Sequence, residues 1–244
     1  MKQVLLVAGL CFTLFSYGQQ ASSDGGIFKK AGGILNKVKG GSKTSLSNED
    51  IVAGLKEALS VGATNSSKKL SATDGFFANA VIKVLMPEEA KKVESTLRAA
   101  GMGSMVDKAI LSMNRAAEEA SKSAAPIFLD AVKKMSFQDA LGILKGHDSA
   151  ATGYLKGKTL PALTAAFRPV IEDALQKTNA TKYWKDVFDT YNKLSFKKVN
   201  TDLPAYVTDK AMSGLFYQVA LEEQKIRKDP AARVSDVLKK VFGS

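Results

Sequence analysis

Apolar residues recur every three or four positions along most of the chain from Leu46 onward. This spacing places apolar side chains on one face of an α-helix. The clearest sets are Ile51, Leu55, Ala58 and Leu59; Val106, Ala109, Ile110, Met113 and Ala117; Leu160, Leu163, Phe167, Ile171 and Leu175; and Leu215, Phe216, Val219 and Ala220. No stretch shows sustained alternation of apolar and polar residues bounded by turn signals. The pattern predicts an all-α fold of about nine to eleven short helices.

Capping residues support this prediction. Ser47 with Asp50, and Ser136 with Asp139, place a side-chain acceptor at a helix start and an acid in its first turn. The segments between the predicted helices are too short to be domain linkers. We therefore expect a single helical domain over residues 46–244.

Other helix ends are indicated by proline, glycine and acidic residues. Pro87 is expected to start a helix and Gly101 to end it, with Ser104 capping the next helix. Asp148 is expected to cap the helix that follows it. Asp229 is expected to start the last helix.

Residues 1–18 have the order of a secretory signal peptide. Lys2 precedes an apolar run over residues 4–15, and the small residues Ser16 and Gly18 stand at the −3 and −1 positions of a cleavage site. The run is shorter than the roughly 20 residues that a membrane-spanning helix needs. The sequence therefore predicts export, with a periplasmic or envelope location after cleavage near Gly18.

The only cysteine, Cys11, lies inside this apolar run. Cleavage would remove it, so the mature chain would have no disulfide, reactive thiol or cysteine metal ligand. Lipidation of Cys11 is the alternative, although Leu10 stands where a lipidation site has a small residue.

Residues 19–45 are rich in Gly, Ser and Lys and are predicted to form a flexible tether. Apolar and basic residues in it also fall near the two faces of a short amphipathic helix, which would suit an anionic membrane surface. Glycines in the middle of the segment oppose that helix. The candidate membrane-surface residues are Phe28, Lys29, Lys30, Lys37 and Lys39.

The formal net charge is +11. For an exported protein the acidic partners are anionic envelope lipid, lipopolysaccharide or an envelope protein rather than nucleic acid. Solubility alone is the alternative explanation of the charge. Thr152 stands where a phosphate-binding loop requires its first glycine, and His147 is the only histidine. We expect no cofactor and no metal.

Two polar clusters remain as candidate ligand sites. Asn114, Arg115 and Glu118 lie on a helix with strongly apolar faces, so they either line a cavity or lie on the surface. The second cluster contains Glu222, Glu223, Arg227 and Arg233, together with Asp229. Glu223 and Arg227 are spaced to form an ion pair on one helix. This cluster is interpreted as a structural ion-pair corner, with a ligand site as the alternative.

Several longer blocks resemble one known family. They are LSATDGFF (70–77), MPEEA (86–90), GMGSMVDKAILSMNRAAE (101–118), KSAAPIF (122–128), DALGIL (139–144) and DPAAR (229–233). They resemble the bacterial family of proteins of unknown function numbered 4197, over about residues 46–242. The resemblance implies an exported helical protein without an assigned activity, so no catalytic residue carries over.

Three functional hypotheses follow. The first is a non-enzymatic envelope protein that binds an acidic or amphiphilic partner through its basic surface and helical grooves. The second is a carrier of a hydrophobic ligand, with a cavity lined by Phe76, Phe77, Ile110, Met113 and Phe128. The third is an enzyme of unrecognised type, which would require Arg115, Glu118, Glu222 and Arg233 to converge in one cleft.

Overall fold

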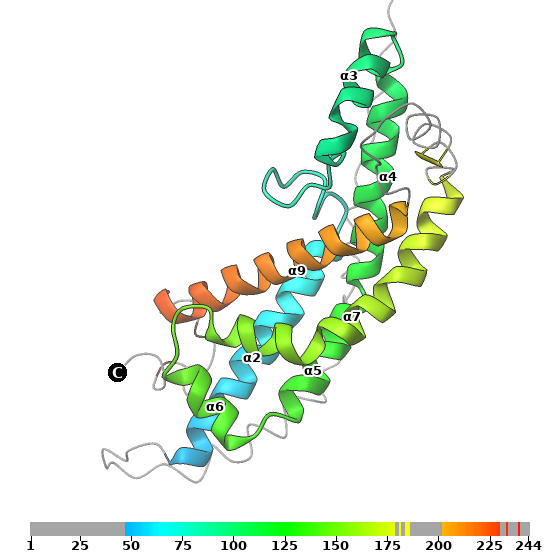
Figure 1. Ribbon diagram of the computed structural model, residues 1–244. Helices are drawn as coiled ribbons and strands as arrows, with labels where there is room; N and C mark the ends of the chain where they lie inside the picture. The colour runs from blue at the N-terminus through cyan, green and yellow to red at the C-terminus, as the bar shows by residue number, and fades with distance from the viewer. Residues whose placement is uncertain are drawn as a thin grey trace, which may run out of the picture. The chain divides into compact units, whose positions relative to one another are not determined.

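The computed structural model describes residues 47–178, 181, 184–185, 202–229, 233 and 239. All regular secondary structure in these residues is helical, as predicted (Figure 1). The predicted signal peptide, the tether with its five candidate membrane-surface residues, and most of the predicted last helix lie outside the described residues.

The described residues contain fewer and longer helices than the nine to eleven short ones expected. They are α2 (Asn48–Ser71), the 3₁₀ turn η1 (Glu88–Ala90), α3 (Lys91–Ala99), α4 (Gly103–Ser121), α5 (Ala124–Lys133), α6 (Phe137–Leu144), α7 (Ala150–Lys177) and α9 (Leu203–Lys228). Helix α7 has 28 residues and continues through Pro161 and Pro169. A proline removes one backbone hydrogen bond. The buried face of α7, which includes Leu163 and Phe167, nevertheless continues across both positions.

Helix α9 lies across α2, α4 and α7 and packs against all three (Figure 1). The predicted apolar faces meet there in one continuous core. Phe128 of α5 and Phe216 of α9 contact each other edge to face, with ring centroids 5.9 Å apart. The three-to-four-residue periodicity therefore identified the core-facing sides of these helices correctly.

The helix ends confirm some of the predicted caps. Ser47 and Ser136 form capping boxes with Asp50 and Asp139. Gly101 ends α3 with φ +77°, while the N–H of Met102 donates to the carbonyl of Leu97. A glycine suits this left-handed position because it has no Cβ.

Two predicted helix starts need correction, while the third, at Pro87, agrees to within one residue. Helix α4 begins at Gly103 with Met102 as its N-cap, so Ser104 does not cap it. Pro87 is the N-cap of η1, which leads into α3. Helix α7 has Ser149 as its N-cap, without a local side-chain cap bond, so Asp148 does not cap it. For α7, a side chain from elsewhere in the fold takes the place of the local cap, as described below.

Residues 72–87 connect α2 to η1 without regular secondary structure. Gly75 lies so close to the end of α2 that a Cβ there would be 2.5 Å from the carbonyl oxygens of Lys69 and Leu70. The ring of Phe76 lies against Gly214 of α9, where a Cβ would be 2.5 Å from its Cε1 atom. Both glycines allow residues 72–87 to pack closely onto the helices.

Candidate binding groove

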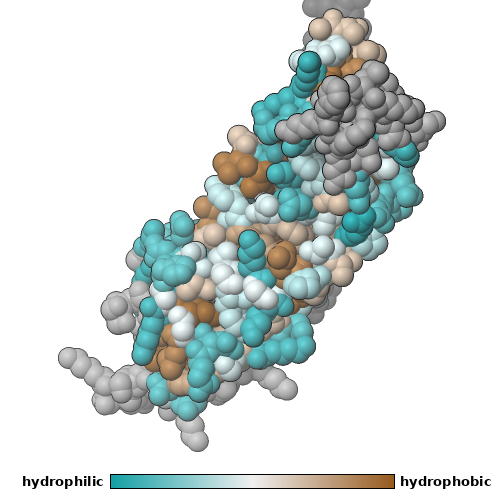
Figure 2. Space-filling model, viewed as in Figure 1, coloured by the Kyte–Doolittle hydropathy of each residue, from teal (hydrophilic) through white to brown (hydrophobic). Residues whose placement is uncertain are grey.

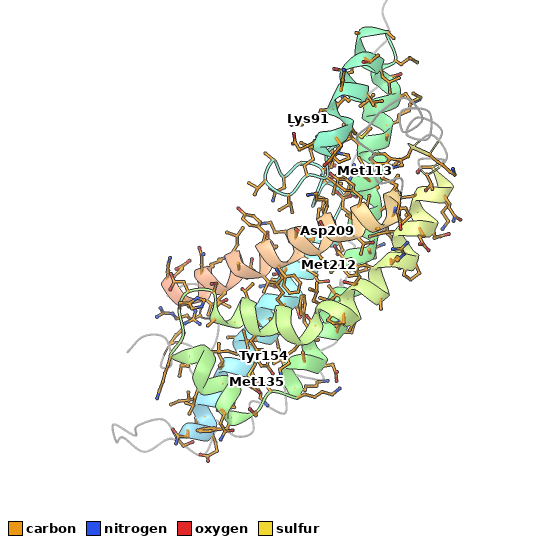
Figure 3. The ribbon with its side chains drawn as sticks, viewed as in Figure 1. Lys91, Met113, Met135, Tyr154, Asp209 and Met212 are labelled. Carbon is orange, nitrogen blue, oxygen red and sulfur yellow. The ribbon has the colours of Figure 1, made fainter. Side chains whose placement is uncertain are left out.

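A groove of about 630 Å³ lies between residues 81–89 and helix α9. Figure 2 shows brown, apolar surface beside the part of α9 where this segment lies, and Figure 3 labels Asp209 and Met212 on that stretch of the helix. The groove is lined by Val81, Ile82, Lys83, Leu85, Met86, Pro87, Glu88 and Glu89 on one side, and by Tyr206, Lys210, Ser213, Gly214 and Tyr217 on the other.

Residues 81–86 alternate between buried and outward-facing positions. Ile82, Val84 and Met86 are buried in the core. Val81 and Leu85 are 67% and 51% exposed.

Residues 79–83 form a turn, in which the N–H groups of Ile82 and Lys83 donate to the C=O of Asn79. From Val84 to Met86 the alternation, together with the extended backbone of Pro87, fits the period of two of an extended chain. One wall of the groove is therefore a turn that leads into an extended segment over residues 84–87, and together they hold large apolar side chains in solvent.

Asn114 of α4 holds this segment from its inner side. Its Oδ1 accepts from the N–H of Val84 at 2.9 Å, and its Nδ2 donates to the C=O of Val84 at 2.8 Å. The same amide nitrogen donates to the C=O of Ile110 at 2.7 Å. Asn114 is completely buried. It thus gives Val84 both bonds that a neighbouring strand would give.

Glu118, one turn further along α4, holds the start of the connecting segment. Its Oε1 accepts from the backbone N–H groups of Phe76 and Phe77, each at 3.1 Å. Its Oε2 accepts from Arg115 at 2.6 Å, and Arg115 also donates to Asp74 at 2.7 Å. These bonds, first to Glu118 and then to Asp74, raise the pKa of Arg115 above its ordinary value. The first candidate cluster therefore positions residues 74–84.

Tyr206 of α9 closes the groove from the other side. Its hydroxyl donates to the C=O of Leu85 at 2.8 Å, and its ring stacks on Trp184 with centroids 6.2 Å apart. Burial, together with the charges of Glu89, Asp209 and Glu88, raises its pKa to about 12. The hydroxyl therefore remains a donor at every physiological pH.

The groove carries two lysines stacked on aromatic rings. Lys83 Nζ lies 3.8 Å from the ring centroid of Phe77, and Lys210 Nζ lies 5.5 Å from that of Tyr206. Neither lysine forms an ion pair with a carboxylate in the described part of the chain. Glu88 and Glu89 lie at the Pro87 end, where Glu88 pairs with Lys91 at 2.8 Å. Beside its apolar surface the groove thus offers two lysines that have no direct ion pair among the described residues, and two glutamates at its Pro87 end.

The second candidate cluster forms a corner between α9 and the start of α7. Glu223 accepts from the backbone N–H groups of Ala151 and Thr152 at 3.0 and 2.8 Å, and also from the Thr152 hydroxyl. Arg227 pairs with Glu223 at 2.9 Å and donates to the C=O of Ile143. Glu223 is therefore the cap of α7 that the local sequence lacks.

The remaining members of this cluster point elsewhere. Arg233 is buried and donates to the carbonyls of Ile226 and Arg227 at 3.2 and 2.9 Å, so it caps the end of α9. Glu222 accepts from Gln218 at 3.4 Å. The interpretation of Glu223 and Arg227 as an ion-pair corner agrees with these contacts, although Arg233 bonds to backbone carbonyls and not to the acids.

The structure does not bring the two clusters together. Glu118 accepts from the backbone N–H of Phe76, and the ring of Phe76 lies against Gly214 of α9. At a rise of about 1.5 Å per residue, Glu223 lies about 13 Å further along α9 than Gly214. The residues named for an enzyme therefore form two separate sets of structural bonds. The residues named for a hydrophobic cavity also pack elsewhere: Phe76, Ile110, Met113 and Phe128 belong to the core, and Phe77 lies beneath Lys83.

Two further observations concern the described residues as a whole. They contain no group of three or more His, Cys, Asp or Glu side chains arranged to hold a metal ion. None of their helices combines the length and apolar character needed to cross a bilayer.

The described residues thus define an all-α protein with an open groove beside its last long helix. The chain belongs to the family of proteins of unknown function DUF4197, whose model matches residues 45–243. This confirms the resemblance noted from the sequence blocks. No curated protein and no solved structure matches the chain.

Proposed function

We propose that this chain is a non-enzymatic binding protein of the cell envelope, and that the groove beside α9 holds an amphiphilic partner. The observation that carries the proposal is the exposure of Val81 and Leu85, at 67% and 51%, on a wall that buried hydrogen bonds hold in place. Large apolar side chains kept in solvent beside a groove mark an interaction site. Lys83 and Lys210 suit an acidic group on the same partner.

The envelope part of the proposal rests on the sequence of residues 1–18. Export limits the partner to anionic lipid, lipopolysaccharide or an envelope protein. The non-enzymatic part is supported by the two polar clusters, since the bonds of Asn114, Glu118 and Glu223 are used to position backbone.

Photo-crosslinking in the source cell tests the groove. A photoreactive amino acid replaces Leu85 or Tyr217, and in a matched control replaces Leu111 of α4, which at 37% is as exposed as Tyr217 but lies outside the groove. We expect both groove positions to yield the same adduct by mass spectrometry and Leu111 to lack it. No adduct at the groove positions, or the same adduct at Leu111, would overturn the proposal.

Export is tested separately by fractionation and by sequencing the N-terminus of the native protein. We expect the mature chain to begin at Gln19 and to be found in the envelope or periplasmic fraction. An intact chain confined to the cytoplasm would contradict the envelope part of the proposal and leave the groove part standing.

A further inference from the structure

The extended segment leaves backbone hydrogen-bonding groups open on its groove side. Val84 turns its N–H and C=O toward Asn114. Consecutive residues of an extended chain present these groups to opposite sides. The N–H and C=O of Leu85 therefore face the groove, and the Tyr206 hydroxyl meets the C=O of Leu85 there. The N–H of Lys83 donates to the C=O of Asn79 in the preceding turn, which leaves the C=O of Lys83 open. No described residue bonds to the N–H of Leu85 or to the C=O of Lys83.

An open donor and acceptor on neighbouring alternate residues are the groups to which another strand pairs. Peptide-binding domains use such edges, with main-chain bonds giving affinity and alternate side chains giving specificity. We infer that the groove binds an extended, acidic peptide segment of a partner protein, which adds as a strand to the edge at Lys83 and Leu85. This inference rests on the proposed function and names the class of its partner.

The side chains beside the edge define the peptide further. Val81 and Leu85 offer apolar contacts on the wall, and Tyr217 offers one on α9. Lys83 and Lys210 lie on aromatic rings that hold their ammonium groups beside the groove. Carboxylates of the incoming strand would form ion pairs with these ammonium groups. A peptide with alternating apolar and acidic residues meets both requirements.

The size of the groove is consistent with a short strand. Four extended residues span about 13 Å, so a peptide strand of this length would run alongside residues 84–87 of the wall. The volume of about 630 Å³ lies within the usual range for enclosed ligand sites. The acids Glu88 and Glu89 at the Pro87 end disfavour a second carboxylate there, so the acidic residues of the peptide should lie toward Lys83.

The experiment begins with a phage-displayed library of random peptides, selected against the mature protein. Enriched peptides are synthesised, and their affinity is measured by fluorescence anisotropy. We expect enriched sequences to alternate apolar and acidic residues. Binding should weaken with salt, because exposed charges are screened. The absence of enriched peptides, or enrichment of basic ones, would overturn the inference.

Two variants at one position isolate the backbone donor. Leu85→Ala removes the isobutyl group and keeps the N–H, whereas Leu85→Pro removes both. Proline is tolerated on an exposed strand edge because that N–H has no internal partner. We expect the affinity of Leu85→Pro to be about tenfold lower than that of Leu85→Ala, as for the loss of one hydrogen bond. Equal affinities would overturn the inference.

A third arm keeps the protein unchanged, in case Leu85→Pro disturbs the segment. Methylation of alternate backbone nitrogens of the enriched peptide removes donors on one edge only. We expect one of the two methylation patterns to weaken binding by about tenfold and the other to leave it unchanged. If both patterns bind equally well, strand addition is wrong. A lipid adduct at Leu85 in cells, with no competition from the peptide, would refute the peptide partner while the proposed function stands.

Discussion

Helices α4 and α9 each bury one glutamate that accepts hydrogen bonds from two consecutive backbone N–H groups. Glu118 holds Phe76 and Phe77, and Glu223 holds Ala151 and Thr152. Each glutamate also pairs with an arginine of its own helix, Glu118 three residues after Arg115 and Glu223 four residues before Arg227. The two arrangements are nearly the same chemically.

They differ in what they hold. Glu223 stabilises the start of α7, which is regular structure inside the core, and its arginine is 13% exposed. Glu118 stabilises an irregular segment that becomes the groove wall, and its arginine is 38% exposed. The bonds of the α9 corner thus hold the start of α7 and the end of α6, whereas those of the α4 cluster hold the segment that leads to the groove wall.

The largest effect is expected from removing either glutamate. Glu223→Ala and Glu118→Ala should each lower the free energy of unfolding by about 3–5 kcal/mol, since each leaves two backbone N–H groups without an acceptor and breaks an ion pair with an arginine that keeps one other acceptor. Glu223→Ala should cost more, because Arg227 is the more buried arginine. Urea unfolding measures both values. A loss below about 1 kcal/mol for either variant would contradict the assigned role.

Asn114→Ala is expected to have the next largest effect and to separate the two regions. It leaves the N–H and C=O of Val84 without partners, which should cost about 2–4 kcal/mol in all. Hydrogen exchange should show faster exchange in residues 76–86 and unchanged protection at the start of α7. Peptide or partner binding to the groove should fall. Glu223→Gln is the matched control, and it should leave groove binding unchanged.

Tyr206→Phe is expected to have the smallest effect, about 1 kcal/mol near neutral pH for one hydrogen bond. The pKa of Tyr206 is raised to about 12, above the ordinary value of about 10. Its contribution to stability is therefore fully present below pH 10 and is lost as the pH rises through about 12. Phenolate absorbance, compared between wild type and Tyr206→Phe, should show the extra tyrosine titrating near pH 12. Titration near pH 10 would show that Tyr206 is not buried beside Glu89 and Asp209.

The sequence predicted the helical part of the fold well. The face of Leu163, Phe167 and Ile171 was recognised because helical burial repeats at a fixed interval. The extended segment was missed for a definite reason. Its buried residues alternate with Val81 and Leu85, which are also apolar, so the hydropathy of the segment does not alternate although its burial does.

The candidate site was predicted only in part. Asn114 and Glu118 were singled out as polar groups on an apolar helix, and they are indeed buried and bonded. Their partners lie about 30 and 40 residues away along the chain, so the sequence could not say whether they line a cavity or hold backbone. Tyr206 and Lys210 of the groove gave no signal, since isolated polar residues on a long amphipathic helix are ordinary.

The short length of the open edge has a consequence for the behaviour of the protein at high concentration. Long unpaired edges lead identical chains to join and aggregate, and proteins interrupt them with charge and proline. Here Lys83 places a charge within the edge and Pro87 ends it. Two copies that met edge to edge would also place their Lys83 side chains close together. We therefore expect the native protein to stay monodisperse while its groove remains available to a partner of opposite charge.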